Sequence, residues 1–123
     1  MSIRKSIFVV DDDSSMREGV KRLLSKHGFN AIVFESGAEL LSYPDFGAAF
    51  CIVLDIDLKG ESGIALRRYL ADSGCVLPVI FITGNDSDAN RAAAMGSGCI
   101  AYLIKPFTAS SLIEPIQKVS AAA

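Results

Sequence analysis

Two patterns of apolar residues alternate along the chain. Five short runs, rich in branched apolar residues and without clean polar alternation, are typical of strands buried on both faces. They cover residues 7–10, 31–34, 50–54, 79–83 and 100–104. Between and after them, apolar residues recur at helical spacing in five stretches. This alternation predicts an α/β fold in which helices cover both faces of one parallel sheet.

The expected helices carry recognisable end signals. Ser36 and Glu39 have the spacing of a capping box, and Gly28 ends the first helix. The fourth helix, at about 86–95, contains four alanines and few large apolar residues, so it has little surface to bury. The last helix contains Pro115, which we expect to kink or delay it.

Composition narrows the classes of protein that fit this pattern. The chain has 123 residues, 50% of them hydrophobic, and a net charge of -2, which suits one domain over residues 1–123. The balanced charge argues against direct nucleic-acid binding, and the apolar runs are too short for a membrane span. The N-terminus lacks the apolar core of a signal peptide, so we expect a cytoplasmic protein. The three cysteines form no CxxC pair and are expected to be reduced.

Ionisable or hydroxyl side chains stand at the ends of four expected strands. They are Asp11, Asp12 and Asp13 after the first strand, Asp55 at the third, Thr83 at the fourth and Lys105 at the fifth. In an open α/β sheet, ligands bind beyond the carboxyl ends of the strands, so we expect these groups to converge. A single aspartate at such a place is often only a helix cap, the role we expect for Asp13.

The predicted cluster of carboxylates needs a positive charge to offset its repulsion. Carboxylate oxygens suit Mg²⁺, which is typically held by one or two carboxylates together with a phosphate. A lysine nearby can contact a phosphoryl oxygen, and an aspartate can itself be the nucleophile and form an aspartyl phosphate. Carboxylates, a hydroxyl, an ammonium and Mg²⁺ together fit phosphoryl transfer.

The order of these motifs resembles the receiver domain of two-component response regulators. The matching stretches are VVDDD, IVLDIDLKGESG, VIFITG and AYLIKPF, at the first, third, fourth and fifth strands. The positions of Gly63 relative to Asp55 and of Tyr102 relative to Lys105 also resemble the family's spacing. The resemblance covers essentially the whole chain. It implies a (βα)5 flavodoxin-like three-layer sandwich with strand order 2-1-3-4-5.

The resemblance also implies a role for each charged residue of the site. Asp55 corresponds to the phosphoacceptor, and Lys105 to the lysine that binds the phosphoryl group. Asp11 and Asp12 correspond to the acidic pair that holds Mg²⁺ together with Asp55. Asp57 corresponds to the position whose backbone carbonyl completes the metal shell.

Two further residues correspond to the switch of the family. Thr83 matches the switch hydroxyl, whose movement toward the phosphoryl group would vacate space for the ring of Tyr102, the switch aromatic. Tyr102 lies on the last strand, which we expect at a sheet edge. Its position would then change the surface of the fourth helix, the last strand and the last helix. We expect this surface, with Arg91, Met95 and Phe107, to bind a partner or a second copy of the chain.

The implied function is a signalling domain rather than a turnover enzyme. By resemblance, a sensor histidine kinase or a phosphotransfer protein supplies the phosphoryl group, and Asp55 accepts it in a reaction that requires Mg²⁺. Phosphorylation of the domain by itself from a small donor, and dephosphorylation by itself, belong to the same expectation.

The chain departs from the family pattern after Asp55. Leu58-Lys59 stands where receivers commonly have Met-Pro, which restores a backbone N–H and, with Gly60, predicts a looser loop. Asp57 adds a second carboxylate to this loop. Its side chain either faces the site, where it would position water or repel an anionic donor, or points to solvent, the orientation that we favour.

Two alternatives fit parts of the sequence. The first is a degenerate receiver that docks to partners without phosphorylation, against which the complete set of site residues argues. The second is a phosphatase of the haloacid-dehalogenase type, since LDIDLKG resembles the DxD nucleophile loop of that family. In that family the motif follows the first strand, whereas here it follows the third, and the chain has no room for a cap domain.

Overall fold

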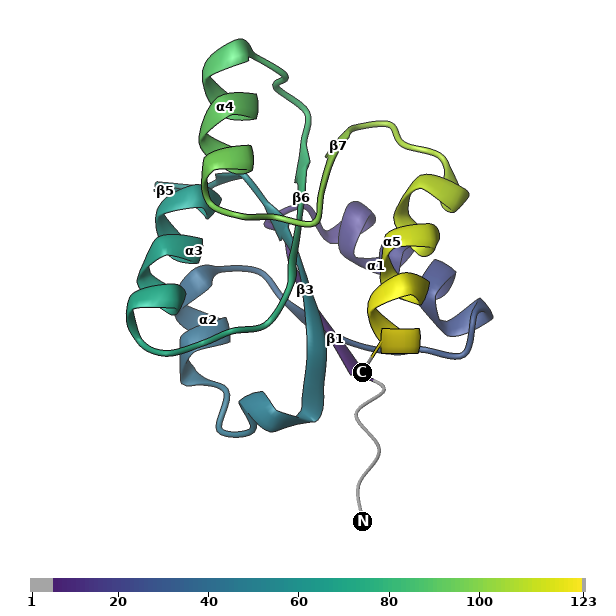
Figure 1. The fold of residues 1–123 in the computed structure, drawn as a ribbon. Helices are drawn as coiled ribbons and strands as arrows, with labels where there is room; N and C mark the ends of the chain where they lie inside the picture. Colours follow the sequence, from purple (N-terminus) through teal and green to yellow (C-terminus); the bar gives the residue numbers. More distant parts are fainter. Residues whose placement is uncertain (1–5, 123) are drawn as a thin grey trace.

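The protein is described by a computed structural model that places residues 6–122. Five parallel strands form one sheet in the order β2-β1-β3-β6-β7 (Figure 1). They are β1 (Ser6–Val10), β2 (Asn30–Phe34), β3 (Ala49–Asp55), β6 (Val79–Thr83) and β7 (Ala101–Ile104). Counted along these five strands, the order is 2-1-3-4-5, so the predicted topology is confirmed.

Helices cover both faces of this sheet and complete a three-layer sandwich (Figure 1). The helices are α1 (Ser14–Lys26), α2 (Gly37–Ser42), α3 (Gly63–Asp72), α4 (Asp88–Gly96) and α5 (Ala109–Ala122), with a short 3-10 turn at Phe46–Ala48. Residues that alternate along each strand feed two separate cores, one beneath α1 and α5 and the other beneath α2, α3 and α4. None of the helices described is long and apolar enough to cross a bilayer.

The helix ends show which sequence signals were reliable. Ser36 Oγ accepts a hydrogen bond from Glu39 N at 3.1 Å, and a Glu39 carboxylate oxygen accepts one from Glu35 N at 2.9 Å. The predicted cap by Ser36 is therefore confirmed, but Glu39 reaches the N–H of Glu35, one residue before the cap, instead of the N–H of Ser36 as in a strict capping box. The expected delay of the last helix was wrong, because α5 begins at Ala109 and contains Pro115 within it.

The loop after β3 forms a small antiparallel ribbon of β4 (Asp57–Leu58) and β5 (Glu61–Ser62). Leu58 is buried, and Gly60 turns the ribbon with a φ of 71°, a value that favours glycine. Glu61 Oε1 accepts a hydrogen bond from Gly37 N at 2.6 Å, which ties the ribbon to α2. Strand pairing and burial of Leu58 hold this segment, and the looseness expected from the missing proline stays a prediction.

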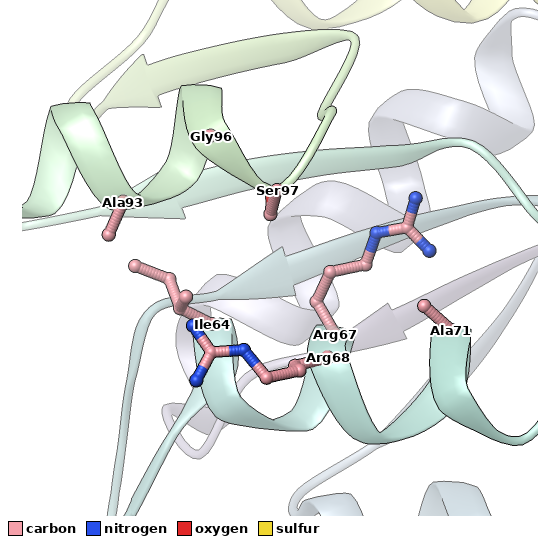
Figure 2. Close-up of a pocket in the computed structure, with 7 residues that line it drawn as sticks. All are labelled: Ile64, Arg67, Arg68, Ala71, Ala93, Gly96 and Ser97. Atoms are coloured by element: carbon pink, nitrogen blue, oxygen red, sulfur yellow. The ribbon is translucent and has the colours of Figure 1, made fainter.

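Helix α4 is anchored by very little apolar burial, as its alanines predicted. Ala94 is its only buried residue. A hollow of about 390 Å³ separates α4 from α3 (Figure 2). Its lining residues are Ile64, Arg67, Arg68, Ala71, Ala93, Gly96 and Ser97. The small side chains that α4 contributes leave this space unfilled, so few contacts hold α4 against α3.

Candidate functional site

Three polar side chains lie buried at the carboxyl ends of the strands. Asp11 follows β1, Asp55 ends β3 and Thr83 ends β6, and their exposed fractions are 0%, 3% and 0%. Within residues 6–122 they are the only buried polar or charged residues. Because burial of an unpaired charge is costly, each of these groups requires partners.

Lys105, directly after β7, connects the two buried carboxylates. Its Nζ donates to Asp11 Oδ2 at 3.0 Å and to Asp55 Oδ2 at 3.1 Å. The second oxygens are also bonded: Asp11 Oδ1 accepts from Asp13 N at 2.9 Å, and Asp55 Oδ1 from Asp57 N at 3.0 Å. One ammonium therefore offsets the repulsion between two carboxylates from different strands.

The environment changes the acidity of this pair of charges. The pKa of Asp55 is raised from 3.8 to about 6, and burial is the main cause. The negative charge of Asp11 raises this pKa further, whereas the hydrogen bond from Asp57 N and the contact with Lys105 lower it. Burial by itself lowers the pKa of Lys105, but its hydrogen bonds and charge interactions with Asp11 and Asp55 outweigh burial and raise that pKa. Lys105 is therefore cationic at neutral pH, where Asp55 is mainly ionised.

Asp12 joins the two buried aspartates in an acidic triangle. One carboxylate oxygen from each of Asp11, Asp12 and Asp55 lies within 4.8 Å of the others. Unlike the other two residues, Asp12 is only half-buried. Three carboxylate oxygens from two adjacent strands are hard donors of the kind that Mg²⁺ prefers. The residues present therefore fit the ion expected from the sequence. Asp13, the third aspartate of the run, instead caps α1 through its side chain, as predicted.

The carboxylate of Asp57 is turned toward the site. Although Asp57 is exposed as a residue, its Oδ2 accepts a hydrogen bond from Thr83 Oγ1 at 2.8 Å. Thr83 Oγ1 in turn accepts one from Asn85 N at 2.9 Å. The solvent-facing orientation that we favoured was therefore wrong, because the buried Thr83 hydroxyl needs an acceptor and Asp57 supplies it.

Tyr102 lies apart from the acidic triangle, on the edge strand β7. Its hydroxyl donates to Asp86 Oδ1 at 2.9 Å, and Arg91 of α4 pairs with the same carboxylate at 3.1 Å. The Arg91 guanidinium lies 5.0 Å from the centre of the Tyr102 ring. The hydrogen bond from Tyr102, together with Arg91, holds the pKa of Asp86 below its usual value. Asp86 thus connects the loop after β6 to both α4 and β7.

Two further residues, Gly63 and Arg17, support the backbone at the ends of β3 and β1. A β-carbon on Gly63 would collide with the carbonyl oxygen of Asp55 and lie 2.9 Å from its carbonyl carbon, so glycine lets α3 begin against the end of β3. Arg17, which the sequence did not single out, donates from Nη1 to the Asp11 carbonyl oxygen at 2.7 Å. No sequence signal distinguishes Arg17 from the other basic residues of α1.

Comparison with known proteins identifies the class to which this fold and site belong. The family model of the response regulator receiver domain matches residues 7–117. The chain therefore belongs to the family of response regulator receiver domains. Members of this family are phosphoacceptor domains of two-component signalling rather than turnover enzymes, and they typically bind Mg²⁺ at an acidic pocket.

Individual relatives agree with this assignment. Nodulation protein W of Bradyrhizobium diazoefficiens is 34% identical over 115 residues, which cover 94% of this chain and 51% of that protein. Response regulator MprA of Mycobacterium bovis is 34% identical over 113 residues, 92% of this chain and 48% of that protein. The chain thus spans about half the length of the curated relatives it matches. The receiver domain of the Francisella response regulator 1452 is similar with a TM-score of 0.87 and 27% identity, covering 96% of this chain and 98% of that one.

Proposed function

We propose that Asp55 accepts a phosphoryl group from a sensor histidine kinase or a phosphotransfer protein. The observation that carries this proposal is the position of Lys105, whose ammonium bonds both Asp55 and Asp11. A buried carboxylate beside a fixed cation is suited to receive a group that carries negative charge. Asp11, Asp12 and Asp55 would hold Mg²⁺ together with the backbone carbonyl of Asp57. When bound, the ion supplies the positive charge that neutralises the phosphoryl oxygens.

The chemistry of the step follows from the protonation of the site. At a pH above its pKa of about 6, Asp55 is ionised and attacks phosphorus without a separate base. The new bond joins a carboxylate oxygen to phosphorus, and the bond between phosphorus and the donor's leaving atom breaks, with its electron pair going to the leaving group. Lys105 remains charged and contacts the transferred group. Hydrolysis of the aspartyl phosphate by the domain itself would return Asp55 to its starting state.

Labelling by a small phosphodonor tests this proposal. Incubation with acetyl phosphate and Mg²⁺ should add one phosphoryl group to the wild type, and EDTA should prevent the addition. Asp55→Asn should take up none, whereas Asp13→Asn should be labelled like the wild type, because asparagine caps a helix as well as aspartate does. Intact-mass spectrometry measures the outcome, and labelled Asp55→Asn would contradict the assignment. An unlabelled wild type would favour the docking module, and sustained turnover of a phosphomonoester would favour a phosphatase.

We further propose that phosphorylation changes the surface formed by α4, β7 and α5. Thr83 would turn its hydroxyl toward the phosphoryl group, and the ring of Tyr102 would move into the space released. Weak anchoring of α4 lets this surface respond at small cost. Met95 and Ile104 expose 61% and 41% of their areas there, which suits contact with a partner or with a second copy of the chain.

Hydrogen exchange tests the proposed response. Addition of beryllofluoride, a mimic of the phosphoryl group, with Mg²⁺ should change protection within residues 86–107 of the wild type. The change in protection should be smaller in Thr83→Ala, because this variant lacks the hydroxyl that would bind the phosphoryl group. Unchanged exchange in this segment, despite binding at Asp55, would contradict the proposed surface.

We also propose that residues 1–123 act as one receiver domain in the cytoplasm. Cys51, Cys75 and Cys99 are all free thiols, which suits a reducing compartment. Fractionation of cells that express the full protein, followed by detection of the domain, would test the location.

A further inference from the structure

We propose that the carboxylate of Asp57 positions Thr83 in the resting state and thereby opposes the switch. This inference rests on the proposed function, because it concerns the hydroxyl proposed to contact the phosphoryl group. It differs from the family resemblance, which assigns only the backbone carbonyl of Asp57 to the site. The side chain of Asp57 would be a positioning residue, acting through Thr83.

The hydroxyl of Thr83 has a single proton to donate. In the structure that proton is directed to Asp57 Oδ2 at 2.8 Å, and Thr83 is completely buried. A phosphoryl oxygen on Asp55 would need the same proton. The two acceptors therefore compete, and the bond to Asp57 must break before Thr83 can contact the phosphoryl group. An ionised acceptor makes this bond stronger than one to a neutral group.

The surroundings of Thr83 favour a rotation of its side chain over a movement of the strand. Its carbonyl oxygen accepts a hydrogen bond from Lys105 N at 2.7 Å, which fixes the backbone at the end of β6. The Asn85 N–H donates to Oγ1 and does not compete for the proton. Redirection of the hydroxyl toward Asp55 thus requires a change between staggered side-chain conformations, which moves Oγ1 and also breaks its hydrogen bond from Asn85 N.

The position of Asp57 is itself held by its neighbours. Asp57 pairs with Ser62 in the β4–β5 ribbon, Leu58 beside it is buried, and Asp57 N donates to Asp55 Oδ1. The carboxylate therefore stays within reach of Thr83. A phosphoryl group on Asp55 would bring nearly two negative charges close to it. Asp57 would then oppose phosphorylation in two ways, by direct repulsion and by holding Thr83.

A double-mutant cycle separates these two effects. The four proteins are the wild type, Asp57→Ala, Thr83→Ala and the double variant, each titrated with beryllofluoride at saturating Mg²⁺ and followed by fluorine NMR. Asp57→Ala keeps the backbone carbonyl. This substitution should raise the affinity for beryllofluoride about tenfold when Thr83 is present. In the Thr83→Ala background, where only the charge repulsion is relieved, the gain should be about two- to threefold.

Two further variants control for charge and for folding. Asp57→Asn keeps an acceptor for Thr83 without the charge and should fall between the wild type and Asp57→Ala. Asp72→Asn removes the same charge from an exposed position at the end of α3 and should leave the affinity unchanged. Without metal or mimic, the amide resonance of Asn85, which donates to Thr83 Oγ1, should shift in Asp57→Ala and stay in place in Asp72→Asn.

Each result of the cycle has a defined meaning. An equal gain from Asp57→Ala in both backgrounds would overturn the inference and leave only charge repulsion, with the proposed function intact. Absence of beryllofluoride binding in the wild type would overturn the proposed function, and the inference with it. A gain that depends on Thr83, together with the Asn85 shift, would establish Asp57 as the residue that positions the resting hydroxyl.

Discussion

Strand β3 and helix α4 differ strongly in how firmly they are packed. All seven residues of β3 are buried, whereas α4 buries only Ala94. Displacement of β3 would expose the centre of the sheet, while displacement of α4 would expose little. The proposed phosphoacceptor therefore stands on a fully buried strand, and the proposed response falls on a helix that buries a single residue.

A short segment after β6 connects these two regions. Asn85 N donates to the hydroxyl of Thr83, and the carboxylate of Asp86 accepts from Tyr102 and pairs with Arg91. Thr83 is therefore only three residues along the chain from Asp86, whose contacts hold Tyr102 and α4. We therefore expect substitutions near β3 to change both stability and phosphorylation of Asp55. Substitutions in α4 should mainly change how the surface of α4, β7 and α5 responds to phosphorylation.

The largest effect is expected where α3 begins against the end of β3. Gly63→Ala would place a methyl group against the carbonyl of Asp55, and only a costly shift of the backbone can relieve this clash. We expect a loss of about 3 kcal/mol or more in the free energy of unfolding, together with weaker phosphorylation of the displaced Asp55. Urea unfolding and acetyl phosphate labelling measure the two effects.

The matched control is a glycine-to-alanine substitution in α4. A β-carbon on Gly96, the last residue of α4, would meet open space. Gly96→Ala should therefore stabilise the protein slightly, by up to about 1 kcal/mol, through the better helix propensity of alanine. Equal unfolding midpoints for Gly63→Ala and the wild type would show that the end of β3 has more freedom than the structure indicates.

A smaller effect is expected from the ionisation of Asp55. Because the folded protein binds this proton more tightly than the unfolded chain, the stabilisation it provides is complete below pH 3.8 and is lost as the pH rises through about 6. Relative to Asp55→Asn, the free energy of unfolding in EDTA should fall by about 1–2 kcal/mol between about pH 4 and pH 7. Mg²⁺ should remove this decline, because the ion favours the carboxylate.

Comparison of the wild type with Asp55→Asn separates the titration of Asp55 from that of its neighbours. The raised pKa of Lys105 affects stability only at alkaline pH, and the lowered pKa of Asp86 acts in both proteins and cancels. Denaturant unfolding at a series of pH values provides the measurement. A difference between the two proteins that stays constant over this range would mean that burial of Asp55 costs nothing.

The sequence predicted the framework well for physical reasons. Buried parallel strands have to be continuous apolar runs, so β1, β3 and β6 were located to within a residue at each end. The carboxyl ends of parallel strands lie at one edge of the sheet, which made the convergence of Asp11, Asp55 and Lys105 predictable. These inferences depend on chain direction and burial, both of which leave a clear pattern in the sequence.

The details that the sequence did not predict depend on side-chain rotation and on very short elements. The bond between Asp57 and Thr83 joins the start of β4 to the end of β6 and is decided by how one carboxylate turns. The β4–β5 ribbon has only two residues on each side, too few to show an alternating pattern. Asp86 was likewise not anticipated, because only the folded chain brings it to Tyr102.

A small effect on stability is also expected in the hollow between α3 and α4. Ala93 points into this space toward Ile64 (Figure 2), so Ala93→Leu would add apolar contacts there. We expect a gain of about 1 kcal/mol in the free energy of unfolding. The same contacts would hold α4 against α3 and so reduce its freedom to respond. Beryllofluoride should still bind at Asp55, but the accompanying change in hydrogen exchange over residues 86–107 should become smaller.

Ala92→Leu is the matched control for this experiment. Ala92 is exposed, and it is not among the residues that line the hollow, so the substitution adds the same atoms to the same helix without filling the space. It should leave both the unfolding midpoint and the exchange response close to those of the wild type. If Ala93→Leu raised stability and yet left the exchange response at full size, weak anchoring of α4 would not be what permits the switch. If both variants reduced the response equally, the cause would be bulk on α4 rather than packing against α3.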